Sequence, residues 1–197
     1  MVRRELGSPD FFDFFPKLAA RPAHESRVAR DAVQDYNSVM LRRDLLVYVD
    51  ASVVGGCEDQ EFATDSLALW RRFVDGRYTL VLSAHTLREL EGAPEKVGAH
   101  LDEVPEFHQT LLPDSAEATE LAAAYIQHGI LGPGSQADAL HIALATTGRV
   151  DVLVSWNFRH IVNLGRIRLF NAVNLEQGYG VLEIRTPKEV LEYEESF

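Results

Sequence analysis

The 197-residue chain contains a single cysteine, Cys57, and this scarcity excludes an internal disulfide framework. A lone thiol is typical of a protein from a reducing compartment, so a cytoplasmic location is expected. The sequence also lacks any run of about 18 apolar residues, the length that a membrane-spanning helix needs. The basic N-terminal residues have no apolar stretch behind them, so no secretory signal and no membrane partner are expected.

Positive charge is scarce as well. The chain carries 19 Lys and Arg against 30 Asp and Glu, a formal net charge of −11. This surplus of acid argues against a protein that coats nucleic acid or membrane through its overall charge. An RNA substrate is still compatible with this net charge, because a local patch of basic side chains is enough to bind RNA. Clustered metal-binding acids would also contribute to the negative net charge. The sequence has no internal repeat and no low-complexity tract.

The charge changes near residue 44. Residues 1–44 carry 8 Lys and Arg and 7 Asp and Glu, whereas residues 45–197 carry 11 and 23. The first segment is interpreted as an N-terminal helical extension, with an amphipathic helix at 26–36. Its apolar side chains include Phe11, Phe12, Phe14, Phe15, Val28, Ala32 and Tyr36. So short a piece cannot bury these side chains alone. It is expected to dock on its own domain or on a dimer mate, either completing the core or restraining the active site like an antitoxin segment.

Residues 45–197 alternate between strand and helix patterns. Strands are predicted at 45–50, 78–82 and 151–155, and helices at about 60–75, after Ser83, near Pro94, at about 115–128, at 135–147 and after Thr186. Ser83 and Ser135 are expected N-caps, and capping boxes are expected at Asp114 and Thr186. Strands separated by helices predict a central, mainly parallel sheet within a three-layer α/β/α sandwich.

Three acids occur in apolar surroundings that ordinarily exclude charge. Asp50 ends the apolar run 45–49, Glu89 lies between two leucines, and Asp138 lies near the start of the apolar helix 135–147. Because an unpaired carboxylate is costly there, each acid needs a partner. No Lys or Arg is spaced to neutralise all three acids, whereas a divalent cation would.

Each acid also has an ordinary structural interpretation when it is considered alone. Asp50 suits a turn or a helix cap, and Glu89 suits a solvated position on a helix. Asp138, at the third helical position, complements the helix dipole. The hypothesis of a metal site therefore depends on the three acids as a set.

Four segments together resemble a PIN-domain ribonuclease of the VapC-like branch, which contains toxins of toxin–antitoxin pairs. They are Val-Tyr-Val-Asp-Ala-Ser-Val at 47–53, Leu-Ser-Ala-His-Thr-Leu-Arg-Glu-Leu at 82–90, Ala-Asp-Ala-Leu-His-Ile-Ala at 137–143 and Asp-Val-Leu-Val-Ser-Trp-Asn-Phe-Arg-His-Ile at 151–161. The resemblance covers about residues 45–191. It implies an endoribonuclease dependent on Mg²⁺ or Mn²⁺, with Asp50, Glu89 and Asp138 as catalytic metal ligands.

The sequence departs from the family pattern at one position. The fourth acid of the family follows the strand that ends in Ser-Trp, and this chain has Asn157 there. An amide offers one neutral oxygen, so Asn157 is expected to hold a second ion more weakly than a carboxylate. Mg²⁺ commonly needs only one or two carboxylates together with waters and substrate phosphate, so the first ion is expected to bind.

The resemblance implies hydrolysis by a metal-bound water that attacks the phosphodiester in line and leaves a 5′ phosphate. Ser52 is a candidate hydrogen-bond partner of Asp50, and His141 a candidate partner near Asp138, although a turn hydroxyl and a core histidine are the ordinary alternatives. Arg159 is a candidate phosphate ligand, and a solvated arginine is its alternative. Arg166 and Arg168 are expected at a strand edge, where they would add to an RNA lip. Trp156 is interpreted as a core residue rather than as a stacking platform.

Other functions fit less well. A haloacid-dehalogenase-type phosphatase needs a second acid where Ser52 stands, and a receiver domain needs an acidic pair that is absent. The serious alternative is a catalytically weakened PIN fold that acts as an RNA- or protein-binding module, which Asn157 favours. The expected partners are an RNA substrate, an antitoxin protein or the chain's own N-terminal segment, and a second copy in a homodimer.

Overall fold

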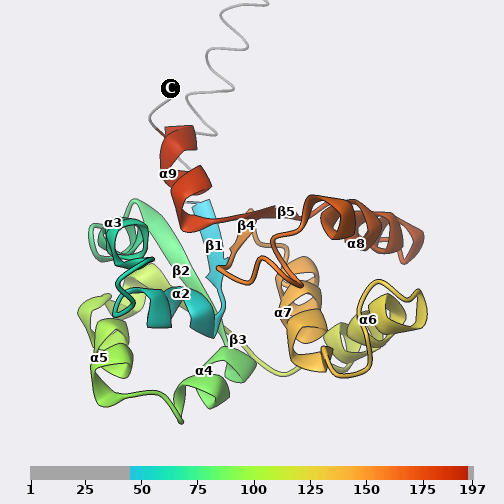
Figure 1. Ribbon diagram of the computed structural model, residues 1–197, viewed down its shortest axis with the longest axis horizontal. Coiled ribbons are helices and arrows are strands. Elements are labelled where there is room, and N and C mark those ends of the chain that lie inside the picture. The colour runs from blue at the N-terminus through green and yellow to red at the C-terminus, as the bar shows by residue number, and fades with distance from the viewer. Residues whose placement is uncertain (1–44, 195–197) are drawn as a thin grey trace, which may run out of the picture. The chain divides into compact units, whose positions relative to one another are not determined.

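The computed structural model describes residues 45–194 (Figure 1). The predicted N-terminal extension, with its helix at 26–36, lies outside the described residues, so its docking and the domain boundary near residue 44 stay predictions. Within residues 45–194, none of the helices has the length and apolar character that crossing a bilayer requires.

Five parallel strands form the described sheet, in the order β3-β2-β1-β4-β5. The strands are β1 Leu45–Val49, β2 Tyr78–Ser83, β3 Gln109–Leu112, β4 Val152–Val154 and β5 Glu183–Arg185. The first strand, β1, lies at the centre, where it pairs with β2 on one side and β4 on the other. The carboxyl ends of β1, β2 and β4 therefore lie side by side at one edge of the sheet.

Helices cover both faces of the sheet (Figure 1). They are α2 Ala51–Gly56, α3 Ala63–Val74, α4 Ala84–Leu90, α5 Glu95–Glu103, the short 3₁₀ helix η2 Glu106–His108, α6 Ala116–Gln127, α7 Gln136–Thr147, α8 Leu164–Glu176 and α9 Pro187–Glu194. Strand side chains alternate between the faces: Tyr48 packs with α6, α7 and α8, whereas Val47 and Val49 pack with α2, α3 and α9. The prediction of a three-layer α/β/α sandwich around a parallel sheet is confirmed.

Several local predictions are confirmed. The Ser83 side chain accepts a hydrogen bond from the Thr86 backbone N–H at 3.0 Å and so caps α4. The capping box of α9 is complete, because Thr186 and Glu189 exchange hydrogen bonds of 2.8 and 3.2 Å between side chain and backbone N–H. Helix α7 is buried over most of its length between the sheet and α6, as its apolar composition indicates.

Other local predictions are wrong. Ser115, not Asp114, caps α6, and the carboxylate of Asp114 instead pairs with both terminal nitrogens of Arg88 at 2.9 Å. Arg166 and Arg168 lie in α8 rather than at a strand edge, since the Asn163 side chain starts a helix by accepting from the Arg166 backbone N–H. The alternation of two arginines around one isoleucine was too short a pattern to specify a strand.

The backbone of α2 closely approaches the loop after β4, and this contact predicts a large difference between two adjacent glycines. A Cβ atom on Gly56 would lie 2.5 Å from Ser66 Oγ and 2.9 Å from Trp156 Nε1, two atoms that share a 2.8 Å hydrogen bond. We expect Gly56→Ala to lower the free energy of unfolding by about 1–3 kcal/mol through overpacking, measured by urea denaturation. Gly55→Ala is the matched control, because no heavy atom lies within 4 Å of its added Cβ. Equal stability of the two variants would contradict the packing argument.

Candidate active site

Polar side chains converge where the central strands end. Asp50 follows β1, Ser83 is the last residue of β2, and Ser155 follows β4. All three side chains are buried, which is unusual for polar groups at the ends of strands. In an open α/β sheet this carboxyl edge is where ligands bind, so the geometry marks the edge as the candidate site.

Asp50 is almost completely buried, with 4% of its surface exposed, and it caps the N-terminus of α2. Its Oδ1 accepts hydrogen bonds from the Ser52 and Val53 backbone N–H groups and, at 2.5 Å, from the Ser52 hydroxyl. Its Oδ2 accepts from the Ser155 hydroxyl at 2.6 Å. Burial raises the pKa of Asp50, and the nearby His141 and these hydrogen bonds only partly offset that effect.

The loop after β4 is fastened to Asp50 through two serines. The Ser52 hydroxyl, which donates to Asp50 as the sequence led us to expect, also accepts from the Trp156 backbone N–H at 3.0 Å. The Ser155 hydroxyl likewise accepts from the Asn157 backbone N–H at 2.9 Å. Asp50 therefore holds both α2 and the β4 loop in position.

Asp138 contacts that same loop from the first turn of α7. Its Oδ1 accepts from Asn157 Nδ2 at 2.6 Å, and its Oδ2 lies 2.7 Å from Nδ1 of His160. The amide oxygen of Asn157 accepts from the His160 backbone N–H at 2.9 Å. Ser135, which occupies the N-cap position of α7, makes no capping bond, and its hydroxyl lies 3.3 Å from His160 Nδ1. Each oxygen of Asp138 thus has one partner from the protein itself.

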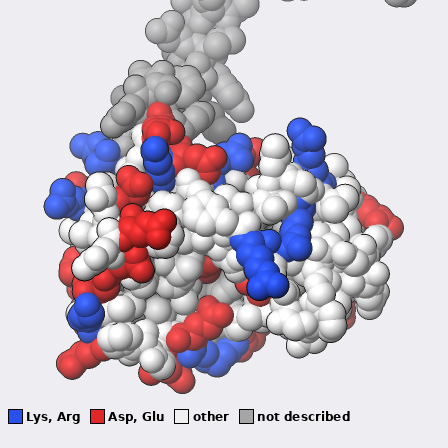
Figure 2. Space-filling model, viewed as in Figure 1, with Lys and Arg blue, Asp and Glu red and all other residues white. Residues whose placement is uncertain are grey.

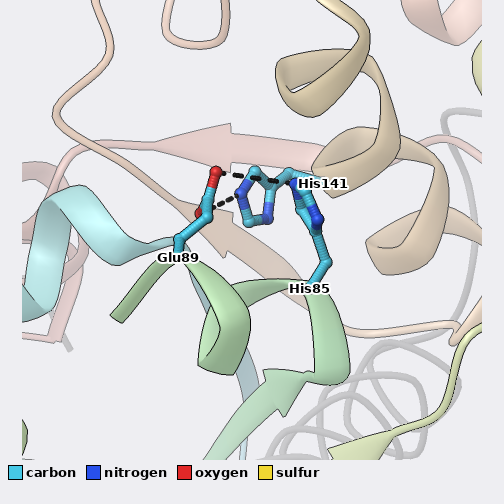
Figure 3. Close-up of side chains that lie close together, drawn as sticks. All are labelled: His85, Glu89 and His141. Carbon is cyan, nitrogen blue, oxygen red and sulfur yellow. Dashed lines mark hydrogen bonds and ion pairs between the residues drawn. The ribbon is translucent and has the colours of Figure 1, made fainter. Parts of the chain in front are cut away.

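Glu89 belongs to a third group of side chains, which contains two histidines (Figure 3). Its Oε2 lies 2.8 Å from His141 Nε2, and its Oε1 lies 3.5 Å from His85 Nε2. Burial opposes the ionisation of Glu89, but the hydrogen bond from His141 and the two histidine charges outweigh burial and lower the pKa of Glu89. On its other side, His141 Nδ1 lies 2.8 Å from the hydroxyl of Tyr48.

The three predicted acids thus fall into two hydrogen-bond networks: Asp50 and Asp138 are linked through the β4 loop, whereas Glu89 lies with His141 and Tyr48. Among the described residues, the three-residue group whose ligand atoms come within 4.8 Å of one another is His85, Glu89 and His141. A carboxylate oxygen accepts two hydrogen bonds or metal contacts, and Asp50 Oδ2 has one protein donor. Both oxygens of Asp138 likewise have one partner each. The carboxylates therefore fit a hard divalent cation, which prefers oxygen ligands.

Sequence reasoning missed several contributors to this edge. Ser155 and His85 lie within the quoted motifs but were given no role there. The i,i+4 spacing of His85 and Glu89 on one helix is the signal that predicts the contact between these two side chains. His141 is a buried histidine whose two ring nitrogens contact Tyr48 and Glu89, as the core-histidine interpretation requires, and it is not the partner of Asp138. His160 is the residue that takes the place beside Asp138.

The residues expected to contact substrate lie around the β4 loop. Trp156 is half-buried: it packs against the edge of the core, as the sequence favoured, and stacks on Phe62 with ring centroids 4.5 Å apart. Phe158, 51% exposed, lies next to this pair, with its ring centroid 6.0 Å from that of Trp156. Arg159 is exposed, and its backbone carbonyl accepts from Arg166 Nη1 at 2.7 Å.

Charge is distributed unevenly over the surface that Figure 2 shows. Acidic atoms gather over the half that contains α3 and α5, whereas basic atoms are prominent over the half that contains α7 and α8. A chain whose overall charge is −11 therefore still presents basic side chains beside the loop after β4.

Comparison with known proteins gives structural likeness only. No protein-family model matches the chain, and no curated protein matches it. Among solved structures, the chain is similar to VapBC2 from Rickettsia felis, in a structure bound to a DNA fragment from the promoter, with 13% identity and a TM-score of 0.41. It is also similar to FitAcB from Neisseria gonorrhoeae, with 17% identity and a TM-score of 0.44. Each likeness covers 72% of this chain and 98% of the other.

Proposed function

We propose that the protein is a metal-dependent endoribonuclease of the PIN, VapC-like type, with Asp50, Glu89 and Asp138 as its acidic ligands and Mg²⁺ or Mn²⁺ as its ion. One observation carries the proposal. Asp50 and Asp138, 88 positions apart in the sequence, are joined through Ser155 and Asn157 at the carboxyl edge of the sheet. A buried carboxylate, Asp50, linked in this way to the half-buried carboxylate of Asp138 is costly for stability alone, and a cation would make the arrangement favourable.

The residues of the edge have separate roles in this proposal. A bound divalent cation would supply Lewis acidity and lower the pKa of a coordinated water. Ser52 and Ser155 fix the carboxylate of Asp50, so that its free acceptor position stays oriented toward the site. Asn157 fixes Asp138 through its amide nitrogen. Because that nitrogen faces Asp138, Asn157 orients a ligand here and is a weak candidate for a ligand itself.

RNA is proposed as the substrate because a partly exposed aromatic surface adjoins the acids. Trp156 stacks on Phe62, and its backbone N–H is bonded to Ser52, which in turn contacts Asp50. Exposed Phe158 extends this surface. Unpaired bases stack on such rings with little regard to sequence, so single-stranded or looped RNA fits best. Arg159, on the same loop, is proposed to bind phosphate.

The direct test is cleavage of a labelled, unstructured RNA by the full chain after EDTA treatment and dialysis. We expect no cleavage in EDTA and recovery with Mg²⁺ or Mn²⁺, with products that carry a 5′ phosphate. Zn²⁺ and Ca²⁺ serve as comparison ions in the same assay. Equal cleavage in EDTA and in Mg²⁺ would falsify the metal mechanism.

Asn157 provides a second test, because its present contact with Asp138 requires an N–H donor. In Asn157→Asp, two carboxylates would face each other, and charges about 4 Å apart repel by roughly 4 kcal/mol at an effective dielectric near 20. We expect at least tenfold tighter Mn²⁺ binding by calorimetry, together with lower stability in EDTA. Asn163→Asp, a substitution of the same kind at the cap of α8, should leave Mn²⁺ binding unchanged. If Asn157→Asp binds Mn²⁺ no more tightly than the wild type, Asn157 does not adjoin the ion.

A second candidate function is a catalytically weakened fold that binds RNA or protein. The observation that favours it is that both oxygens of Asp138 already have a protein partner, Asn157 for one and His160 for the other. Binding of RNA without cleavage in any of the tested metals would support this alternative. An antitoxin-type partner and a homodimer also belong to the proposal, since exposed apolar side chains such as Phe158, Leu164 and Leu169 are available for protein contacts.

A further inference from the structure

We propose that His85, Glu89 and His141 form a binding site for a borderline transition-metal ion of the Zn²⁺ and Co²⁺ class. Figure 3 shows the three side chains directed toward one another from two helices. His85 and Glu89 are four residues apart on one side of α4, and His141 comes from α7. Their ligand atoms all lie within 4.8 Å of one another.

The ligand chemistry selects the metal class. Two imidazole nitrogens and one carboxylate oxygen suit Zn²⁺, Co²⁺, Ni²⁺ and Fe²⁺, whereas Mg²⁺ and Ca²⁺ prefer sites built from oxygen alone. Three protein ligands also leave a coordination position open for water or another small ligand. This set therefore differs in preference from the oxygen ligands of Asp50 and Asp138.

A second observation points to a missing ligand. The Nε2 atom of His85 is buried and has no hydrogen-bond partner within the described part of the chain. Buried polar atoms without a partner are rare and call for an explanation, such as an ion. Nε2 lies 3.5 Å from Glu89 Oε1, on the side where the ion would lie.

The surroundings of His141 complete the site. Its Nδ1 is hydrogen-bonded to the Tyr48 hydroxyl at 2.8 Å, and that hydroxyl lies 2.8 Å from Ser83 Oγ. Metal-binding histidines typically use their second nitrogen in this way, which fixes the orientation of the ring. The other nitrogen, Nε2, faces Glu89 at 2.8 Å.

Only small movements are needed to bind an ion. Ligands about 2.1 Å from a tetrahedral ion lie about 3.4 Å apart, so the most separated pair would close by up to about 1.4 Å. The side chains of His85 and Glu89 are 17% and 32% exposed and come from the surface helix α4, which gives them room to move. His141 is held by Tyr48 and is the fixed member of the site.

The test uses the full chain, treated with EDTA, dialysed and titrated with Co²⁺ and Zn²⁺. We expect one Co²⁺ per chain with visible absorption bands of a nitrogen-containing site, which Zn²⁺ abolishes and a hundredfold excess of Mg²⁺ does not. His85→Gln and Glu89→Gln should each weaken Co²⁺ binding by at least tenfold. His128→Gln is the matched control, because it removes a surface histidine that also pairs with a glutamate, 3.6 Å away.

The result that overturns the proposal is an unchanged Co²⁺ affinity in both His85→Gln and Glu89→Gln, or displacement of Co²⁺ by Mg²⁺ at equal concentration. Because His141 is buried and its substitution would disturb the fold, the test does not depend on it. The site stands independently of the proposed ribonuclease function, although both use Glu89. Asp50→Asn distinguishes the two proposals. This variant should keep the Co²⁺ spectrum of the wild type, whether or not the wild type cleaves RNA.

Discussion

Replacement of Asp50 by asparagine is expected to slow RNA cleavage by at least ~100-fold, equivalent to about 2.7 kcal/mol of transition-state stabilisation. Asparagine keeps the cap of α2 but removes the buried charge that would hold the cation. The measurement is the single-turnover rate at saturating Mn²⁺. Asp151→Asn is the matched control, because Asp151 precedes β4 at the opposite edge of the sheet and accepts from the Leu46 backbone N–H. It should cleave like the wild type.

The same variant should be more stable than the wild type in EDTA at neutral pH. Burial raises the pKa of Asp50 in the folded protein above its ordinary value in the unfolded chain. As the pH rises from the ordinary pKa through the pKa of the folded protein, the free energy of unfolding therefore falls. This loss of stability is absent at low pH, where the carboxyl is protonated in both states, and asparagine never incurs it. Thermal unfolding of both proteins at pH 4 and pH 7 measures the difference. A wild type that gains stability relative to Asp50→Asn as the pH rises would show that the buried charge is already compensated.

Asp138→Asn is the second substitution expected to reduce cleavage by at least ~100-fold. Its carboxylate contacts Asn157 and His160, and an amide at this position offers one neutral oxygen in place of two oxygens that share a charge.

Removing the imidazole of His160, which competes with a cation for Asp138, should act in the opposite direction. We therefore expect His160→Ala to bind Mn²⁺ at least several-fold more tightly, because Oδ2 of Asp138 becomes available.

Calorimetry with Mn²⁺ and cleavage rates at several metal concentrations check both variants. His108→Ala is a suitable comparison for His160→Ala, since His108 bonds the Phe73 carbonyl far from the acids in the sequence. Should Asp138→Asn cleave at the wild-type rate, Asp138 would be a helix-capping acid only, and the alternative given by the helix dipole would be correct.

The elements that could be predicted from the sequence are those with strong local patterns. The apolar run before Asp50 specifies the buried central strand, and the apolar helix after Ser135 specifies the buried α7. Ser83 and Thr186 specify helix starts through side-chain hydrogen bonds that require only neighbouring residues. The layer architecture follows from these elements because parallel strands need crossovers.

The elements that could not be predicted depend on contacts between distant segments. β3 and β5 are strands of only four and three residues at the two edges of the sheet, too short for a pattern of alternating burial to identify them. The partners of the acids were equally hidden. Asn157 faces Asp138 with its nitrogen rather than its oxygen because the His160 backbone N–H occupies that oxygen, and no spacing rule contains this information.

The hydrogen bond between Ser155 and Asp50 joins residues that are 105 positions apart. During synthesis, β1 and β2 leave the ribosome long before β4, so the nascent chain contains Asp50 without the serine that orients it. At 5–20 residues per second, this interval lasts roughly 5–20 s. For the proposed ribonuclease, the growing chain is therefore inert beside its own messenger RNA, and competence arises only once most of the domain has been translated.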